Sequence, residues 1–369
     1  MTKSNSKPPL KVDVDTFAQT VSTWQKAEGR HHLPWQDTRD PYRIWLSEIM
    51  LQQTQVATVI DYYHRFLRRF PTLADLARAP QSDVLAYWAG LGYYARARNL
   101  HRCAQTVMEQ WGGRFPETPD AIVTLPGIGR STAAAIAAFS FGYRAPIMDG
   151  NVKRVFTRFF GIFGHTGTKA VETKLWSLAQ SIVDHGPKHL DMISYTQGLM
   201  DLGATRCTRA SPDCTACPLA YSCYANLHNA QKELPSPRPR KAIPRRECHM
   251  LVLLHGDKVL LEKRPQTGIW GGLWCLPQFN ELAELERACL QWGVEPGASN
   301  RMAALEHTFT HFKLQITPWW LTAPHLPLAQ PNDQQCWQPL GLLAETGLPT
   351  PVQKILQGIN QSLPEDEHN

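Results

Sequence analysis

The 369-residue sequence lacks any long hydrophobic run, since no window approaches the roughly 18 consecutive apolar residues of a membrane-spanning helix. Its first fifteen residues, MTKSNSKPPLKVDVD, contain no apolar stretch and no arginine, so neither a secretory signal nor a transit peptide is expected. A large excess of one charge is absent as well, with 38 Lys+Arg against 32 Asp+Glu, and 43% hydrophobic residues exclude wholesale disorder. These absences predict an intracellular, cytoplasmic globular protein without a membrane partner. No internal repeat or sign of oligomerisation is apparent, so a monomer is expected.

The sequence also lacks an even number of cysteines. Its nine cysteines cannot all pair within the chain, which argues against a complete disulfide framework. Five cysteines are scattered and indicate core packing, whereas four lie within 17 residues as C-x6-C-x2-C-x5-C. These four are Cys207, Cys214, Cys217 and Cys223. One close pair flanked by single cysteines favours a single four-thiolate iron–sulfur cluster, with structural zinc or no metal as alternatives.

Charge is unevenly distributed along the chain. Residues 1–227 carry 25 basic and 18 acidic side chains, residues 228–246 carry 6 and 1, and residues 247–369 carry 7 and 13. A basic body favours a polyanionic partner, although a charge excess can also be a solvated surface. The prolines at 235, 237, 239 and 244 prevent a continuous helix or central strand, so 228–246 is interpreted as an extended interdomain linker.

The two sides of this linker differ in hydrophobic pattern. Helical periodicity is present over 55–70, 81–90, 95–111, 131–141, 151–160 and 171–183. After the linker, MLVLLHGDKVLLEKR predicts two strands around a turn at 255–257, and FTHFKLQITPWWL alternates like a further strand. We therefore predict a mostly α region over 1–227 and an α+β domain over 247–369.

A glycine-rich turn, Leu125-Pro-Gly-Ile-Gly129, precedes an alanine-rich helix. Gly127 and Gly129 permit a tight turn whose backbone N–H groups can hold a phosphate, although many turns between helices need glycine for geometry alone. A helix, this turn and a second helix form an element that can grip a DNA strand through its phosphates. Asp149 follows in IMDGNVKRV, where it can cap a helix and stay ionised at the helix N-terminus, and could face a developing cation.

The segment PYRIWLSEIMLQQTQ reads as a largely apolar helix. Glu48, Gln52 and Gln55 fall at i, i+4 and i+7 and form a polar stripe, which either faces water or lines a pocket. A partly desolvated Glu48 has a raised pKa and can deliver a proton near neutral pH. One protonated and one ionised carboxyl group suit cleavage of a glycosidic bond.

Together these segments resemble one family, the iron–sulfur helix–hairpin–helix DNA glycosylases, and within it the MutY family of adenine glycosylases. The resemblance is carried by WLSEIMLQQTQ, GLGYYARARNL, LPGIGRSTAAAI, IMDGNVKRV and the cysteine loop, in matching order over residues 34–223. It implies a six-helix barrel with a [4Fe-4S] module, and an enzyme of the DNA nucleoid that flips adenine out of duplex DNA opposite 8-oxoguanine or guanine and excises it.

The resemblance also implies roles for individual residues. Glu48 would protonate the adenine ring, and Asp149 would stabilise the sugar cation, directly or through a transient adduct, with Asn151 assisting. Arg30 and Gln197 match positions that line the adenine pocket. The positions expected to contact DNA are Gln52, Tyr93, Gly127, Gly129, Ser131 and Lys153.

Ser131 separates two subfamilies of these enzymes. The endonuclease III type has a lysine at this position, which forms a Schiff base and cuts the strand, whereas a serine cannot. We therefore predict a monofunctional glycosylase that leaves an abasic site. The alternatives are a bifunctional oxidised-pyrimidine glycosylase/lyase and a non-catalytic iron–sulfur DNA-binding protein.

The C-terminal region resembles the Nudix-like domain of the same family. A Nudix hydrolase needs a glutamate-rich metal motif, and no such run follows Gly271-Gly272. The region is therefore expected to recognise the lesion rather than to hydrolyse nucleotides. Where the family has Phe-Ser-His, this sequence has Phe309-Thr310-His311, so a methyl group is added beside the hydroxyl.

Overall fold

The computed structural model describes residues 14–237, 242–323 and 334–360. Contacts between residues divide the chain into two compact units. The described part of the first unit holds residues 14–64, 72–77 and 102–237, and that of the second holds 65–71, 78–101, 242–323 and 334–360. Three described helices, α3, α4 and α6, contribute residues to both units.

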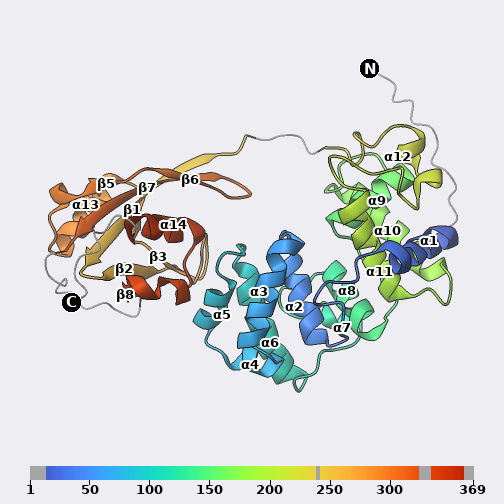
Figure 1. Ribbon diagram of the computed structural model, residues 1–369, viewed down its shortest axis with the longest axis horizontal. Helices are drawn as coiled ribbons and strands as arrows, with labels where there is room; N and C mark the ends of the chain where they lie inside the picture. The colour runs from blue at the N-terminus through green and yellow to red at the C-terminus, as the bar shows by residue number, and fades with distance from the viewer. Residues whose placement is uncertain (1–13, 238–241, 324–333, 361–369) are drawn as a thin grey trace. The chain divides into compact units, whose positions relative to one another are not determined.

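The first unit is built of helices joined by short loops (Figure 1). Its elements are α1 (Val14–Glu28), α2 (Pro41–Leu51), α3 (Val56–Arg69), α4 (Leu73–Arg78), α6 (Ala95–Gln110), α7 (Pro119–Ile122), α8 (Arg130–Phe141), α9 (Gly150–Phe160), α10 (Lys169–His185), α11 (Met192–Asp201), a π-helical turn (Leu202–Arg206), a 3-10 turn (Ala220–Ser222) and α12 (Tyr224–Leu227). Many of the helix ends carry the residues that physical chemistry favours there. Asp40 caps α2 before Pro41, and Gly161 ends α9 in the left-handed region at φ 65°.

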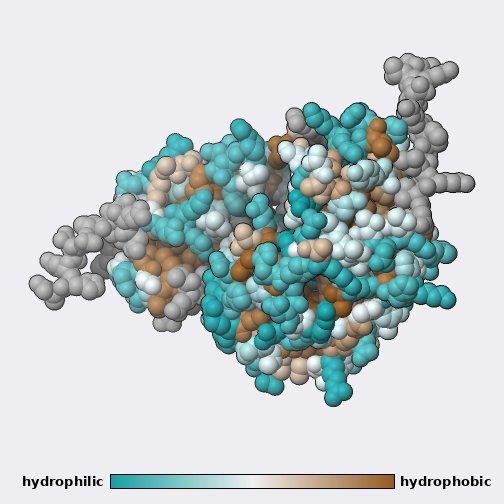
Figure 2. Space-filling model, turned by 45° about the vertical axis from the view of Figure 1, so that its right-hand side comes forward, coloured by the Kyte–Doolittle hydropathy of each residue, from teal (hydrophilic) through white to brown (hydrophobic). Residues whose placement is uncertain are grey.

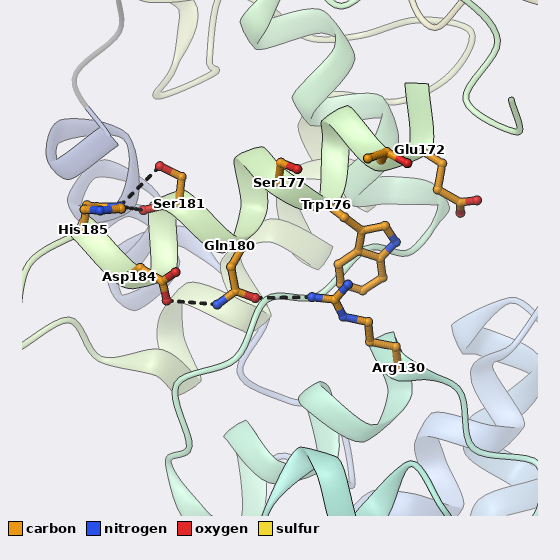
Figure 3. Close-up of a pocket in the computed structure, with 9 residues that line it drawn as sticks. Arg130, Glu172, Trp176, Ser177, Gln180, Ser181, Asp184 and His185 are labelled. Carbon is orange, nitrogen blue, oxygen red and sulfur yellow. Dashed lines mark hydrogen bonds between the residues drawn. The ribbon is translucent and has the colours of Figure 1, made fainter. Parts of the chain in front are cut away.

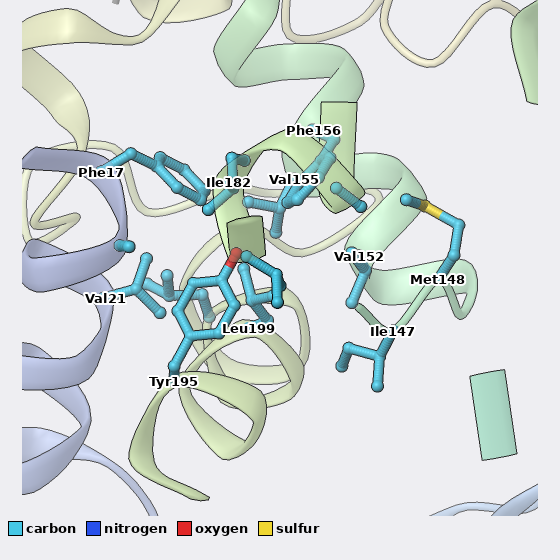
Figure 4. Packing of buried hydrophobic residues seen from close by; sticks show 14 of the residues in the cluster. Phe17, Val21, Ile147, Met148, Val152, Val155, Phe156, Ile182, Tyr195 and Leu199 are labelled. Atoms are coloured by element: carbon cyan, nitrogen blue, oxygen red, sulfur yellow. The ribbon is translucent and has the colours of Figure 1, made fainter. Parts of the chain in front are cut away.

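One hydrophobic core joins α1, α9, α10 and α11 (Figure 4). Phe17 of α1 meets Phe156 of α9 edge-on, with ring centroids 5.7 Å apart. Tyr195 and Leu199 of α11 are almost completely buried in the same cluster. Because the core fixes α9 and α11 against each other, it also fixes the polar residues at the ends of these helices.

The second unit combines α5 (Gln81–Trp88) and the N-terminal part of α6 with a mixed eight-stranded sheet. Its strands are β1 (Arg245–His255), β2 (Lys258–Lys263), β3 (Trp274–Cys275), β4 (Gln278–Phe279), β5 (Asn300–Arg301), β6 (Leu305–Thr308), β7 (Lys313–Thr322) and β8 (Gln335–Pro339). The helices in the same region are α13 (Leu282–Gln291), α14 (Thr350–Asn360) and two 3-10 turns (Pro296–Ala298 and Leu340–Glu345).

The centre of the sheet is a parallel pair. The strand order is β3-β2-β1-β7-β5, with β4 also on β1, β6 on β7 and β8 on β2. Strand β1 runs parallel to β7 from Arg245↔Lys313 to Leu254↔Thr322, and the other pairings are antiparallel. Residues 250–254 are all buried, so both faces of β1 are covered, as a parallel pair requires.

The fold class confirms the expectation of a helical region followed by an α+β domain, and three details differ from it. Helix α2 ends at Leu51, so Gln52 is its C-cap and Gln55 lies beyond it. The predicted polar stripe therefore does not continue along one helix past Glu48. The sequence FTHF is not strand but the turn of a hairpin, in which Phe309 N–H donates to the Phe312 carbonyl at 2.8 Å.

The third difference concerns the segment interpreted as an extended linker. Residues 228–234 form turns in which Ala230 and Leu234 are buried against Tyr224. Arg158 of α9, itself 3% exposed, donates from Nε to the Leu234 carbonyl at 2.8 Å and from Nη2 to the Gln231 carbonyl at 3.0 Å. The first half of this segment is thus part of the packed first unit, while residues 238–241 lie outside the described residues.

In the described part of the chain, no helix combines the length and the apolar character that crossing a bilayer requires. The face shown in Figure 2 is dominated by hydrophilic residues, with hydrophobic ones in separate patches.

Candidate active site

A cavity of about 430 Å³ lies between α1, α2, α8 and α11 in the first unit. Glu48 and Gln197 both line it, together with Trp35, Ser47 and Phe139. Most of its lining residues are polar or charged, and Trp35, Ile44, Phe139 and Ile193 are the apolar ones. Convergent polar groups in a concave site are typical of a pocket that recognises a polar ligand such as a base.

Glu48 is placed by the apolar side chains around it on α2. Ile44, Trp45 and Ile49 are buried, and Glu48 lines the cavity beside Ser47 of the same helix. Glu48 itself is half-buried. Burial, and next the negative charge of Asp149, raise the pKa of Glu48 from 4.5 to about 8. The carboxyl group is therefore mainly protonated at neutral pH and can act as a general acid.

Asp149 is the N-cap of α9, as its position before Gly150 predicted. Its Oδ1 accepts the Val152 N–H at 2.7 Å. Burial raises the pKa of Asp149, while the N–H groups of Val152 and Asn151 and the charges of Arg154 and Lys153 act in the opposite direction. The sequence indicated the helix N-terminus, which favours the ionised form, but not the burial that outweighs it.

Asn151, one residue into α9, is held in place by an arginine that the sequence analysis did not single out. Arg154 Nη2 donates to Asn151 Oδ1 at 2.7 Å and to the Gly203 carbonyl at 2.6 Å. Its Nε donates to the Cys207 carbonyl at 2.7 Å. A Cβ on Gly203 would collide with Asn151, so the close approach of the π-helical turn to α9 requires glycine.

A buried carboxylate joins the two residues predicted to line the adenine pocket. Asp201, completely buried at the end of α11, accepts from Arg30 and from Gln197 Nε2. Arg30 does not line the 430 Å³ cavity, whereas Gln197 does. Arg30 is therefore connected to the cavity through Asp201 and Gln197.

The glycine-rich turn connects α7 to α8. Gly127 adopts φ +77°, which only glycine accepts readily, and Gly129 is the N-cap of α8 without a side-chain hydrogen bond. The first N–H groups of α8 are thus available to an anion. Ser131 in that first turn uses its Oγ to accept the Met148 N–H at 2.8 Å, which ties α8 to the residue before Asp149.

A second, more open cavity of about 670 Å³ lies beside the start of α8, along α10 (Figure 3). The Arg130 guanidinium lies over the Trp176 ring, with its Cζ 4.0 Å from the ring centroid, and its Nη2 donates to Gln180 Oε1 at 3.3 Å. Gln180 in turn donates to Asp184 at 2.9 Å. Nearby, Lys153 Nζ is paired with Glu172 at 2.8 Å, so a phosphate would have to compete with this carboxylate.

One predicted DNA contact, Tyr93, and the residue that follows another, Gln53, have strained backbones. Gln53, which follows Gln52, has φ 59°, and Tyr93 has φ 50°. Such values cost free energy for non-glycine residues and are concentrated at functional sites. Gln52 Nε2 lies 3.4 Å from Thr132 Oγ1 on α8, and the Tyr93 side chain is 47% exposed.

The hairpin turn of the second unit exposes Thr310 and His311 between stacked phenylalanines. Phe309 and Phe312 stack with centroids 4.6 Å apart, and Arg246 lies over the Phe312 ring at 4.4 Å. Within the same unit, Tyr93 Oη and Thr310 Oγ1 are 3.1 Å apart and share a hydrogen bond.

The four clustered cysteines line one cavity in the first unit. Arg158 Nη1 donates to Cys207 Sγ at 3.4 Å, and Gln231 Nε2 lies 3.8 Å from Cys214 Sγ. Donors directed at sulfur suit thiolates, the form that binds iron or zinc. Among the described residues, no group of three or more His, Cys, Asp and Glu side chains is arranged so that it could hold a metal ion.

The chain is similar in sequence to known DNA repair proteins. Residues 46–181 match the HhH-GPD superfamily of base excision DNA repair proteins, and residues 249–358 match the NUDIX domain. An adenine DNA glycosylase of Buchnera aphidicola subsp. Acyrthosiphon pisum is 36% identical over 348 residues, which cover 94% of this chain and 98% of that one. The chain belongs to the adenine DNA glycosylase family. The human adenine DNA glycosylase is 35% identical over 365 residues, covering 82% of this chain and 66% of its own length.

A solved structure described as a thermostable thymine-DNA glycosylase is also similar. It is 31% identical, with a TM-score of 0.52, over 58% of this chain and 97% of its own. Membership of the adenine DNA glycosylases confirms the resemblance, and thereby the DNA glycosylase class of enzyme acting on N-glycosyl bonds.

The structure adds three residues to those that the sequence indicated for this adenine DNA glycosylase: Arg154, Asp201 and Met148. Each acts through a contact between segments far apart in the chain, such as the 171 residues that separate Arg30 from Asp201. One local signal was available for Asp201, because it lies four residues after Gln197 on the same helix.

Proposed function

We propose that this adenine DNA glycosylase excises adenine mispaired with 8-oxoguanine or guanine in duplex DNA, by hydrolysis of the N-glycosidic bond. The proposal is supported chiefly by the environment of Glu48. Its carboxyl group has a pKa of about 8, raised by burial and by the negative charge of Asp149, and it lines the same cavity as Gln197. Cleavage of a glycosidic bond typically uses a pair of carboxyl groups, one of which donates a proton at neutral pH.

The reaction follows from the placement of the two carboxyl groups. Glu48 donates its proton to a ring nitrogen of the flipped adenine, so that the base leaves with the electron pair of the C1′–N9 bond. Asp149 stabilises the positive charge that develops on the sugar, with Asn151 oriented beside it by Arg154. Water adds at C1′ and passes a proton to the Glu48 carboxylate, which restores the acid and leaves an abasic site and free adenine.

The absence of a lysine at position 131 supports a monofunctional reaction. Ser131 Oγ is already bonded to the Met148 N–H, and a hydroxyl cannot form a Schiff base with the sugar. The alternative of a bifunctional glycosylase/lyase therefore has no amine at the position where that subfamily carries it.

Contacts to DNA are assigned to the basic part of the chain. The N–H groups that follow Gly127 and Gly129 would hold a phosphate, with Lys153 nearby. Gln52 and Tyr93 would enter the duplex, which fits their strained surroundings. The hairpin residues Phe309, Thr310 and His311 would read the base opposite adenine.

By function, we assign residues 1–227 to catalysis and 247–369 to lesion recognition. Residues 228–246 connect the two, and within them 228–234 also pack as part of the first unit. We further assign one [4Fe-4S] cluster to Cys207, Cys214, Cys217 and Cys223, because all four thiols line one cavity and N–H groups of Arg158 and Gln231 are directed at two of the sulfurs, although no group of described side chains is arranged to hold a metal ion. Bound there, the cluster would stabilise the loop that follows α11. The protein would act as a monomer on DNA of the nucleoid.

The test is single-turnover base release from duplexes with adenine opposite 8-oxoguanine, guanine or thymine. Fast release opposite 8-oxoguanine, slow release opposite thymine and none from Glu48→Gln would support the proposal. Glu109→Gln, which removes an exposed carboxylate on α6, is the matched control and should be fully active. If iron-loaded, DNA-binding wild-type protein releases no adenine, the non-catalytic alternative is correct.

A further inference from the structure

The buried carboxylate of Asp201 accepts hydrogen bonds from two residues near the pocket. Its Oδ1 is 2.7 Å from Arg30 Nε, 2.7 Å from Arg30 Nη2 and 2.8 Å from Gln197 Nε2. Its Oδ2 accepts the Arg30 backbone N–H at 2.9 Å. All four contacts are donations to Asp201, which is 0% exposed.

These contacts determine which end of the Gln197 amide faces Asp201. A carboxylate can only accept hydrogen bonds, and an arginine can only donate them. The NH₂ group of Gln197 is therefore the end that faces Asp201, because a carbonyl oxygen there would meet a second acceptor. An amide orientation that is often ambiguous is here set by its partner.

The opposite end of the amide is the one available to a base. Gln197 lines the cavity that holds Glu48, and no described residue donates a hydrogen bond to its Oε1. Once Nε2 is directed at Asp201, Gln197 offers the cavity an acceptor.

We propose that Asp201 is the positioning residue that gives the pocket its preference for a 6-amino purine, by holding Gln197 with its carbonyl oxygen toward the flipped base. This oxygen accepts a hydrogen bond from the amino group of adenine and opposes the carbonyl oxygen of a 6-oxo purine. The inference rests on the proposed function and concerns how the same pocket selects its substrate.

The selection matters because the substrate duplex contains two purines. Guanine and 8-oxoguanine, the bases opposite adenine, both carry a 6-oxo group. An amide free to rotate would present its NH₂ group to either of them. The fixed amide helps to ensure that adenine, and not its partner, is removed.

The experiment compares single-turnover release of adenine and of hypoxanthine, its 6-oxo analogue, each placed opposite 8-oxoguanine. In Asp201→Asn the new side chain can donate to Gln197 Oε1, which allows the amide to turn. The adenine-to-hypoxanthine rate ratio should then fall about ten-fold, the size expected when a hydrogen bond of ~1.4 kcal/mol is lost or reversed. A loss of folded protein lowers both rates equally and leaves the ratio unchanged.

A second variant tests whether the effect passes through Gln197. Gln197→Met keeps the length of the side chain without the amide, so its ratio should fall to a similar extent. Adding Asp201→Asn to Gln197→Met should change the ratio no further. Gln197→Met alone keeps the test informative if Asp201→Asn does not fold.

Two outcomes would overturn the inference: an unchanged ratio in folded Asp201→Asn or Gln197→Met, or an equal effect of Asp201→Asn with and without Gln197. If wild-type protein releases neither base, the proposed function fails instead, so the two failures are distinguishable.

Discussion

The pKa of Glu48 makes a quantitative prediction for the pH dependence of base release. With a pKa of about 8, about nine-tenths of the Glu48 carboxyl groups are protonated at pH 7 and about one-tenth at pH 9. Because only the protonated form can donate, the single-turnover rate should fall about ten-fold over this interval. Asp149 must be ionised, and its raised pKa should limit the rate on the acidic side.

The assay measures single-turnover adenine release from a duplex with adenine opposite 8-oxoguanine, at saturating enzyme over a range of pH. Binding to an uncleavable duplex at each pH separates loss of chemistry from loss of affinity. Glu109→Gln serves as the matched control and should follow the wild-type profile. A rate that already falls ten-fold per pH unit from pH 6 would mean an ordinary Glu48 pKa and would refute the reasoning. A rate that is flat to pH 9 would exclude Glu48 as the acid.

The same burial predicts a thermodynamic consequence. Glu48 binds a proton more tightly in the folded than in the unfolded protein, so the stability it contributes is present below its unfolded pKa and is lost as the pH rises toward 8. Glu48→Gln should therefore match wild type at pH 5 and be more stable at pH 9 by about 2–4 kcal/mol, a range reduced for water in the cavity. Denaturant unfolding at both pH values provides the measurement, and equal stability at pH 9 would contradict it.

Three further predictions concern the rest of the site. Asp149→Asn keeps an N-cap for Val152, so it should abolish adenine release without lowering the melting temperature by more than about 2 °C. Ser131→Ala removes the partner of the Met148 N–H and should destabilise the protein by about 1–2 kcal/mol in denaturant unfolding, and neither it nor wild type should be trapped on DNA by borohydride. Cys217→Ser should reduce the iron content and melting temperature together, and full stability in iron-free protein would remove the structural role of the cluster.

Local patterns predicted the elements of this chain more reliably than their ends. Apolar spacing located α3, α6, α9 and α10 to within about two residues, the usual uncertainty of helix boundaries. For residues 309–312 the sequence predicts strand, because Phe and Thr also favour strands, and only the pairing of β6 with β7 shows that they form the turn of a hairpin.

The candidate site divides in the same way. Glu48 and Asp149 could be selected from one helix pattern and one helix cap, together with the family resemblance. Other features of the site arise only from tertiary structure. They are the burial that raises the Asp149 pKa, the ion pair of Lys153 with Glu172 and the hydrogen bond from Arg30 to Asp201. No periodicity within a single segment contains that information.

The turns after α12 define where the catalytic unit can be cut. A fragment that ends at residue 227 would remove the buried Leu234 side chain, worth about 1.5–3 kcal/mol of burial, and would deprive Arg158 of the Leu234 and Gln231 carbonyls. It would also remove Gln231 from beside Cys214. A fragment that ends at residue 237 keeps all of these contacts. Separate expression of the glycosylase unit should therefore begin from the longer fragment, since it keeps Gln231 in the lining of the cavity that holds the four thiols.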